Sequence, residues 1–270
     1  NFIFPLIVSA YVSRILLAEG VGKVSSAQNI VTYFAILAAL GLPTYGTKVI
    51  ASCGDNRDKR NKAFSELFII NAISTIICSI TYYIMVIQIP YFQQRQSLFI
   101  VCGLSIIFNI INVDWFYQGC EEYGYIMIRN LLIKVISLVA IFIFVKSVDD
   151  YIKYAAVSTF SKVANNIFNI VHLKKYISFT FQDLRIIQHI KPVFVFLAAS
   201  IAIEIYTLAD TTMLTFIHGD KIVGYYTTAR KGIDVIRTMI IAVCAVFLPR
   251  LSYYYSNKEY TSFKNLMDRG

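Results

Sequence analysis

Apolar residues run along this chain in long blocks that contain no charged side chain. Four of these blocks cover residues 24–47, 67–91, 98–113 and 239–248. A helix needs about 20 mostly apolar residues to cross the hydrocarbon core of a bilayer, and the second block exceeds that length. The blocks do not alternate apolar with polar positions, so the pattern predicts membrane-spanning helices rather than the strands of a barrel.

Polar breaks divide the chain into eight predicted spans. They cover residues 1–17, 24–50, 65–90, 97–117, 130–146, 152–173, 192–217 and 223–249. The chain begins at Asn1 inside an apolar run and without a Met, so we expect a piece of a longer protein whose first helix lacks its beginning. No basic segment with a small-residue cleavage site precedes the first run, which argues against a signal peptide.

Composition and charge agree with a polytopic membrane protein. Hydrophobic residues make up 57% of the chain, charged residues 15%, and the mean hydropathy is +0.61. The net charge of +9 is unevenly distributed between the two predicted membrane faces. One set of loops holds Arg57, Lys59, Arg60, Lys62, Arg129, Lys134, Lys174, Lys175, Arg185, Lys191, Arg250, Lys258, Lys264 and Arg269, and the other holds Arg14, Lys23, Arg95, Lys146, Lys153 and Lys221. The richer face is predicted to be cytoplasmic, with the N-terminus on that side, and no nucleic acid is needed to explain the charge.

Motifs of soluble enzymes are missing from the sequence. The five cysteines contain no C-x-x-C pair, and His172, His189 and His218 share no metal-ligand spacing. Gly22-Lys23 lacks the upstream glycine of a phosphate-binding loop, and no G-x-S-x-G elbow occurs. We therefore expect neither catalysis nor a metal site nor a bound cofactor.

Polar residues inside the spans carry the functional information, because they are costly in lipid and usually face a bundle interior or a water-filled cavity. At 100° per residue they form one edge on each of five helices. The edges are Ser105, Asn109 and Asn112; Asn130, Lys134 and Ser137; Ser158, Lys162, Asn165 and Asn169; Glu204, Thr207 and Thr211; and Thr227, Arg230, Asp234 and Arg237. For Ser105, Asn109, Asn112 and Ser137, helix-to-helix hydrogen bonding remains an equal alternative to a cavity.

Arg and Lys residues near the middle of the predicted spans favour a cavity that binds an anion. Arg230, Arg237 and Lys162 would each cost about 2.5 to 3.5 kcal/mol at the centre of a span. Asp234 lies one turn from Arg230 and neutralises one of them, which leaves a cationic interior suited to an anionic substrate. We expect these cations to converge on one wet vestibule; internally paired structural charges are the alternative. Lys48 and Arg14 lie nearer the span ends, where snorkelling to the interface is equally plausible.

A weak internal repeat points to duplication. Residues 21–27 (VGKVSSA) recur as residues 223–229 (VGYYTTA), 202 positions later, and each copy opens a long span that runs toward Pro43 or Pro249. Duplicated bundles with a binding site between the halves are a transporter architecture. The first half would hold six spans, and the second would begin at Lys191-Pro192.

Several stretches resemble one family, in its order. They are residues 10–16 (AYVSRIL), 18–22 (AEGVG), 33–34 (YF), 40–41 (LG), 45–48 (YGTK), 50–51 (IA), 114–119 (DWFYQG) with Glu121, 129–130 (RN), 205–210 (IYTLAD), 213–214 (ML), 223–226 (VGYY) and 248–252 (LPRLS). They resemble Wzx-type flippases of the multidrug/oligosaccharidyl-lipid/polysaccharide exporter superfamily, which move lipid-linked polysaccharide repeat units. Two departures are Leu17, where a glycine is expected, and Thr211, where a lysine is expected after Asp210.

The resemblance implies an all-α polytopic bundle of two pseudo-symmetric six-helix lobes in the bacterial cytoplasmic membrane. Residues 1–175 would form the first lobe, and residues 176–270 a cytoplasmic linker with two helices of the second. The substrate would be a polyprenyl-diphosphate-linked oligosaccharide, with surrounding membrane lipids and the polysaccharide polymerase and chain-length machinery as partners. Its diphosphate and sugars would contact Arg230, Arg237, Lys162, Lys48, Arg14, Asn165, Asn169 and Thr227. Candidate carboxylates for H⁺ or Na⁺ coupling are Asp114, Glu204, Asp210 and Asp234.

Three rival functions remain open. A multidrug cation antiporter of the same superfamily would need a cavity rich in carboxylates. A membrane polysaccharide polymerase or glycosyltransferase should carry a large loop on the non-cytoplasmic side, whereas the predicted loops there are short. A non-transporting scaffold of the assembly machinery is the third.

Overall fold

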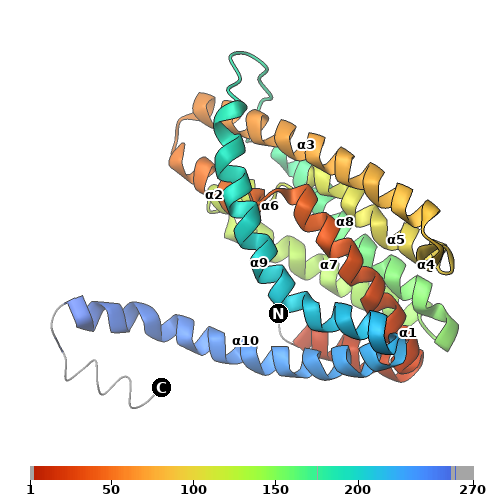
Figure 1. The fold of residues 1–270 in the computed structure, drawn as a ribbon. Helices are drawn as coiled ribbons and strands as arrows, with labels where there is room; N and C mark the ends of the chain where they lie inside the picture. Colours follow the sequence, from red (N-terminus) through yellow and green to blue (C-terminus); the bar gives the residue numbers. More distant parts are fainter. Residues whose placement is uncertain (1–2, 175, 257–258, 260–270) are drawn as a thin grey trace.

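The computed structural model describes residues 3–174, 176–256 and 259. The described residues form helices and contain no strand, as predicted (Figure 1). The helices are α1 (Ile3–Ala39), α2 (Leu42–Ser52), α3 (Arg57–Gln88), α4 (Pro90–Gln93), α5 (Gln96–Ile107), α6 (Asp114–Gly119), α7 (Tyr123–Phe144), α8 (Tyr151–Leu173), α9 (Ile187–His218) and α10 (Asp220–Ser256), with 3₁₀ turns η1 (Phe108–Ile111) and η2 (Val148–Asp150).

Two of the predicted spans contain breaks. Span 24–50 is interrupted at Leu40 and Gly41, whose φ angles of 50° and 72° end α1 before α2 begins. Span 97–117 is wrong as one continuous helix, because it is divided into α5, η1 and α6. The extended conformation of Asn112 (φ −79°, ψ 96°) separates η1 from α6. Asparagine side chains compete for backbone hydrogen bonds, which explains why an apolar run rich in Asn breaks here.

Long apolar helices make this chain a multi-pass membrane protein. Four segments have the length and composition to cross a bilayer: residues 4–52, which comprise α1 and α2, then α3, α7 and α9. The outer face of α3 is a stripe of isoleucines, each 48–58% exposed. The stripe consists of Ile73, Ile76, Ile80, Ile84 and Ile87. Such a surface is stable against acyl chains and would be a liability in water.

Contacts between connections define two opposite ends of the bundle. At one end, called the Asp220 end, Arg95 pairs with Asp220, and the Lys23 ammonium lies 5.4 Å from the centre of the Tyr151 ring. At the other, called the Asn61 end, the Tyr176 hydroxyl donates to Glu122 at 2.7 Å. The connections alternate between the ends as the predicted spans require. That the Asn61 end is cytoplasmic remains a prediction from charge.

Two apolar clusters occupy the bundle, with a polar layer between them. The first, toward the Asp220 end, includes Leu16, Tyr82 and Phe99, and the second, toward the Asn61 end, includes Phe64 and Phe116. Along α3, the buried polar residues between the clusters are Asn71, Ser74 and Thr75.

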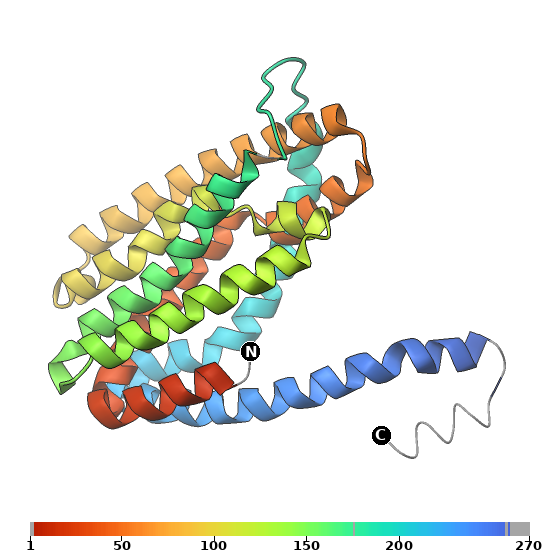
Figure 2. The same ribbon diagram turned by 180° about the vertical axis from the view of Figure 1, so that it is seen from behind.

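The two copies of the sequence repeat pack against each other where α1 meets α10. A Cβ on Gly22 would overlap the carbonyl of Asp220, and a Cβ on Gly224 would overlap the carbonyl of Ala18. Since Ala18 and Asp220 are also 202 positions apart, the contact is reciprocal, like an interface on a two-fold axis. Beyond this crossing α10 leaves the rest of the bundle, as both views show (Figures 1 and 2).

Candidate polar cavity and arginine groove

Polar edges from several helices meet in a cavity of about 400 Å³ that is bordered by α1, α5, η1, α7 and α8. We call this the bundle cavity. Its lining consists of Val31, Thr32, Ala35, Ser105, Asn109, Asn112, Asp114, Asn130, Lys134, Lys162, Asn165 and Asn166. Members of three of the five predicted edges, on the α5–η1 segment, α7 and α8, therefore face one space.

Asparagines of α3 and η1 hold the broken helix that forms one wall. Asn71 Nδ2 donates to the carbonyl of Asn109 at 3.0 Å, and Asn109 Nδ2 donates to Asn71 Oδ1 at 3.3 Å and to Thr75 Oγ1 at 3.2 Å. These bonds satisfy backbone and amide groups freed where α5 ends. Both accounts of Asn109 thus hold, because it bonds helix to helix and also lines the cavity.

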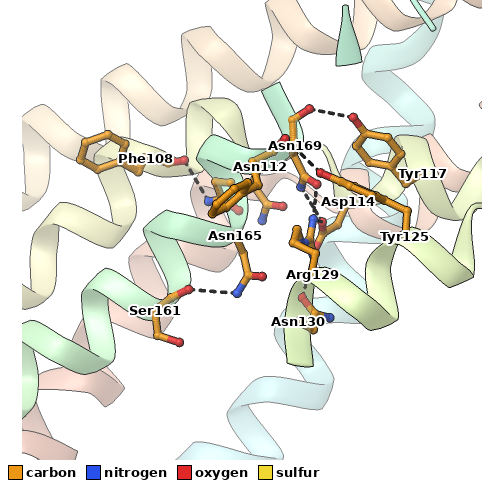
Figure 3. Close-up of polar contacts among 12 residues, drawn as sticks. Phe108, Asn112, Asp114, Tyr117, Tyr125, Arg129, Asn130, Ser161, Asn165 and Asn169 are labelled. Atoms are coloured by element: carbon orange, nitrogen blue, oxygen red, sulfur yellow. Dashed lines mark hydrogen bonds and ion pairs between the residues drawn. The ribbon is translucent and has the colours of Figure 1, made fainter. Parts of the chain in front are cut away.

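A buried ion pair forms a second wall (Figure 3). Arg129 Nη1 and Nη2 donate to the two carboxylate oxygens of Asp114 at 2.8 and 3.3 Å. Asn169 Nδ2 donates to Asp114 Oδ1 at 2.6 Å, and Arg129 also bonds Asn169 Oδ1 and Asn130 Oδ1. The Arg129 side chain is 3% exposed and that of Asp114 34%. Asn169 is therefore used in this network and does not line the cavity.

Lys162 and Asn165 present unfulfilled groups to the bundle cavity. Lys162 is exposed to it, and no ion pair of Lys162 occurs in the part of the chain that the structure describes. Asn165 Nδ2 donates to the carbonyl of Ser161 at 2.9 Å, but its buried Oδ1 has no hydrogen-bond partner among the residues that the structure describes (Figure 3). An ammonium group and an unused acceptor that face one open hollow suit a polar ligand or water.

Arg230 and Arg237 lie in a different hollow, of about 790 Å³, between α9 and α10. We call it the Arg groove, and its lining is Ile205, Tyr206, Ala209, Asp210, Tyr226, Ala229, Arg230, Ile233, Asp234 and Arg237. Arg230 Nε is 3.9 Å from Asp234 Oδ2, and the Tyr226 hydroxyl donates to Asp210 at 2.8 Å. For Arg237 the described side chains provide no ion pair.

Among the described residues, the predicted cations line two different hollows, and their convergence on one vestibule stays a prediction. No residue that lines the bundle cavity also lines the Arg groove. The reason is helix packing: α8 packs on α5 and α7, whereas α10 packs mainly on α1 and α9. The polar edges of α8 and α10 therefore face two different hollows.

The other predicted site residues are scattered. Lys48 on α2 and Arg14 on α1 are exposed, and neither lines the bundle cavity or the Arg groove. Glu204 lines an apolar hollow of about 300 Å³ between α1 and α9, where it accepts a hydrogen bond from Thr207 at 2.9 Å. Thr227 lies at the crossing of α1 with α10, and Ser25 Oγ donates to it at 3.4 Å.

Sequence reasoning missed three charged residues that organise the structure. Arg129 was counted as a loop charge, although it is buried against Asp114. Glu66, directly before an uncharged block, is 1% exposed and bonds His189. Arg95 pairs with Asp220 at the Asp220 end. The position of Glu66 inside the predicted span 65–90 was a usable signal, whereas its partner 123 residues away was not.

Known proteins support the expected resemblance. Two curated proteins, both described as "Putative O-antigen transporter", match this chain. The one from Shigella dysenteriae is 26% identical over 267 residues, covering 96% of this chain and 66% of its own length. The one from Escherichia coli strain K12 is 21% identical over 258 residues, covering 93% and 61%. This chain thus spans slightly less than two thirds of either relative, and no solved structure matches it.

The family comparison covers nearly the whole chain. The model of the polysaccharide biosynthesis protein family matches residues 1–254. That range includes α1 through most of α10, and with them both the bundle cavity and the Arg groove. The chain therefore belongs to the polysaccharide biosynthesis protein family.

Proposed function

We propose that this chain is the first part of a flippase that moves undecaprenyl-diphosphate-linked oligosaccharide repeat units from the cytoplasmic to the outer leaflet. Family membership and the O-antigen transporter description of both relatives support a transporter rather than an enzyme. One observation carries the proposal for this chain. Lys162 and Arg237, both in predicted membrane helices, face open hollows and have no ion pair within the described residues.

Separate hollows suggest separate roles for the two ends of the substrate head group. The planar guanidinium groups of Arg230 and Arg237 match the oxygens of a diphosphate, so the Arg groove would hold it. Lys162, Asn165 and the other amides of the bundle cavity would bond glycan hydroxyls, while the polyprenyl tail stays in lipid. Exposed Lys48 and Arg14 would meet the charged head group near the membrane interfaces.

Alternating access is supported by closure at one end. At the Asp220 end, Ser26 Oγ lies 3.1 Å from Thr215 Oγ1 and donates to Asp220 Oδ1 at 3.3 Å. Together with the Gly22 and Gly224 contacts, these bonds join the first bundle to the α9–α10 turn. Toward its other end α10 diverges from the bundle (Figures 1 and 2). This arrangement suits a state open toward the Asn61 end, which we take as cytoplasmic.

A gradient of H⁺ or Na⁺ would drive the return to this state. Of the candidate coupling carboxylates, Asp114 is held by Arg129, Asp234 lies near Arg230, Asp210 bonds Tyr226, and Glu204 bonds Thr207. Among the described residues, Glu204 is the only one of the four that is bonded to neither a cation nor a phenol, which favours it. A multidrug cation antiporter fits less well, because both hollows contain Lys or Arg.

Complementation of a flippase deletion tests the proposal. Full-length protein should restore surface polysaccharide, and the Arg230→Ala/Arg237→Ala double variant should leave labelled repeat units facing the cytoplasm. Lys231→Ala is the matched control, since Lys231 neighbours Arg230 on α10 but does not line the Arg groove. Normal export by a correctly inserted double variant would refute the assignment of the diphosphate site.

A further inference from the structure

A buried carboxylate joins three elements at the Asn61 end. Glu66 of α3 lies with Oε2 2.7 Å from His189 Nε2, and its Oε1 accepts the backbone N–H of Arg185 at 2.6 Å. Gln188 Nε2 donates to Oε2 at 3.2 Å. The other ring nitrogen of His189, Nδ1, is 2.8 Å from the hydroxyl of Tyr45 on α2. We call these five residues the Glu66 cluster; none of them lines the bundle cavity or the Arg groove.

The connection from α8 to α9 is bound along α3 and ends at this cluster. The backbone N–H of Ser178 donates to Asn61 Oδ1 at 3.2 Å, and that of Thr180 donates to Ser65 Oγ at 3.1 Å. Between them, the Phe179 ring centre lies 5.5 Å from that of Phe64. The connection between α8 and α9, which we call the strap, is therefore packed and hydrogen-bonded against α3 through Ser178, Phe179 and Thr180.

Backbone contact fixes α9 beside the cluster. Gly41, at the turn between α1 and α2, has a φ of 72°, and a Cβ there would lie 2.6 Å from the backbone nitrogen of Leu197. Leu197 is eight residues beyond His189 on α9. Because α9 continues from here to the Arg groove and the Asp220 end, the Glu66 cluster sets the position of the helix that opens the second half.

Hydrogen bonding allows two protonation states. With neutral His189, Nε2–H donates to Glu66 and Nδ1 accepts from the Tyr45 hydroxyl, so the cluster carries one negative charge. Adding a proton at Nδ1 makes the Tyr45 oxygen an acceptor and pairs the new cation with the carboxylate. Placing this proton on Glu66 instead gives the same net charge, with the Glu66 O–H donating to His189 Nε2 and Nδ1–H donating to the Tyr45 oxygen. The titratable and charged groups at the cluster are Tyr45 from α2, Glu66 from α3, and Arg185 and His189 from the strap and α9.

These two states differ in how well a buried charge is compensated. The Glu66 side chain is 2% exposed and that of His189 7%, and among the described residues no Lys or Arg side chain forms an ion pair with Glu66. A buried carboxylate without a permanent cation is strongly destabilising, whereas a hydrogen-bonded ion pair is not. Proton uptake therefore tightens the link between α3 and α9, and proton release loosens it.

We propose that Glu66 and His189 form a proton-binding latch that fixes the strap and α9 on the first bundle at low pH and releases them as pH rises. The latch rests on the proposed function in one respect, because the movement of the strap and α9 that it controls would serve alternating access. The latch is separate from the anion-binding groups and from the candidate coupling carboxylates.

A distance measurement across the strap tests the latch. Spin labels at Asp58→Cys and Gln182→Cys, both exposed positions on α3 and the strap, are placed in full-length protein lacking other cysteines and reconstituted in vesicles. We expect one short distance at about pH 5 and a growing second population toward about pH 8. For one proton, the ratio of populations changes by at most about tenfold per pH unit.

Three variants decide the outcome. His189→Gln keeps hydrogen-bonding groups but removes the ring that takes up the proton, so its distances should no longer depend on pH. Glu66→Gln removes the carboxylate that compensates the added proton, so its transition should move to lower pH. Tyr45→Phe removes the acceptor for the protonated Nδ1–H, a charge-assisted bond that is stronger than the bond neutral Nδ1 accepts, so the transition should move to lower pH. His218→Gln, an exposed histidine at the far end of α9, is the matched control and should behave like the unmodified protein.

A distance that ignores pH in the unmodified protein would overturn the latch, as would an unchanged transition in Glu66→Gln or Tyr45→Phe. Failure of the proposed function would look different. A protein whose strap responds to pH as described, but which moves no repeat units, would keep the latch and lose the flippase assignment.

Discussion

Leu17 and Gly219, 202 residues apart, share one backbone conformation. Leu17 has φ 55° and ψ −179°, and Gly219 has φ 75° and ψ −178°. This region is essentially restricted to glycine. The same offset relates Gly22 to Gly224, and Ser25 to Thr227, which are hydrogen-bonded to each other. The weak sequence repeat thus marks a shared turn between two helices, present once in each predicted half.

The strained turn predicts that Leu17→Gly stabilises the protein. The substitution releases about 1 to 3 kcal/mol of backbone strain and costs about 0.5 to 1 kcal/mol of chain entropy, so a gain of about 1 kcal/mol is expected. The Leu17 side chain is 55% exposed, so little packing is lost. Thermal unfolding of the full-length protein measures the gain. Leu17→Ala removes nearly the same side chain but retains the Cβ, and equal stabilisation by Ala would contradict the strain argument.

The crossing of α1 and α10 predicts a closed contact at the Asp220 end. Cysteines at Ser25 and Thr227 should form a disulfide readily under mild oxidation, because the native hydroxyl oxygens are 3.4 Å apart. Adding Gly22→Ala should greatly reduce this cross-link, since the new methyl group meets the backbone of Asp220. Gly232→Ala on α10 is the control, because nothing lies near a Cβ at that position. Equal cross-linking in both backgrounds would exclude the close packing.

The ion pair of Asp114 with Arg129 predicts strong coupling in stability. Arg129→Ala should cost about 3 kcal/mol or more, because it leaves a carboxylate without its cation in a buried network. The double variant Asp114→Asn/Arg129→Gln should cost less than the sum of the two single changes. A double-mutant cycle of unfolding free energies measures this difference. Additive effects would mean that Asp114 is free for another role, such as ion coupling.

Asp150 predicts a stability difference that depends on pH. The Lys153 ammonium at 2.7 Å, followed by the backbone N–H groups of Lys146 and Ser147, holds the pKa of Asp150 well below its usual range. A carboxyl group with a lowered folded-state pKa stabilises the fold above its unfolded value of about 3.9 and loses that effect as pH falls. Asp150→Asn should therefore unfold at lower temperature than the unmodified protein at neutral pH, with a gap that shrinks below about pH 4. A gap independent of pH would contradict this assignment.

Helix positions were predictable because apolar length and polar breaks are local properties of the sequence. The repeat at residues 21–27 was also visible, although its meaning as a shared turn required the backbone angles of Leu17 and Gly219. The break at Asn112 was missed because hydropathy is blind to an asparagine that competes for backbone hydrogen bonds. Within the correctly placed helix α8, a period of 100° per residue grouped Asn169 with Lys162. In the structure, however, Asn169 bonds the buried Arg129 and does not line the cavity.

Long-range partners were not predictable from one sequence. The periodicity of α8 and α10 shows which residues share a polar face on each helix, but not which helix packs against that face. That Lys162 and Arg230 line different hollows could therefore be learned only from the fold. Glu66 and His189 are 123 residues apart, and nothing local in either segment selects the other as its partner.

Reconstitution of the full-length protein in vesicles with a labelled undecaprenyl-diphosphate oligosaccharide tests most directly whether intramembrane cations receive an anionic head group. The unmodified protein and Lys231→Ala should move the substrate between leaflets. Arg230→Ala/Arg237→Ala should bind it about 100-fold more weakly, as expected for two lost charge-assisted hydrogen bonds of about 1.5 kcal/mol each. Unchanged binding and movement in the folded double variant would show that the diphosphate is held elsewhere.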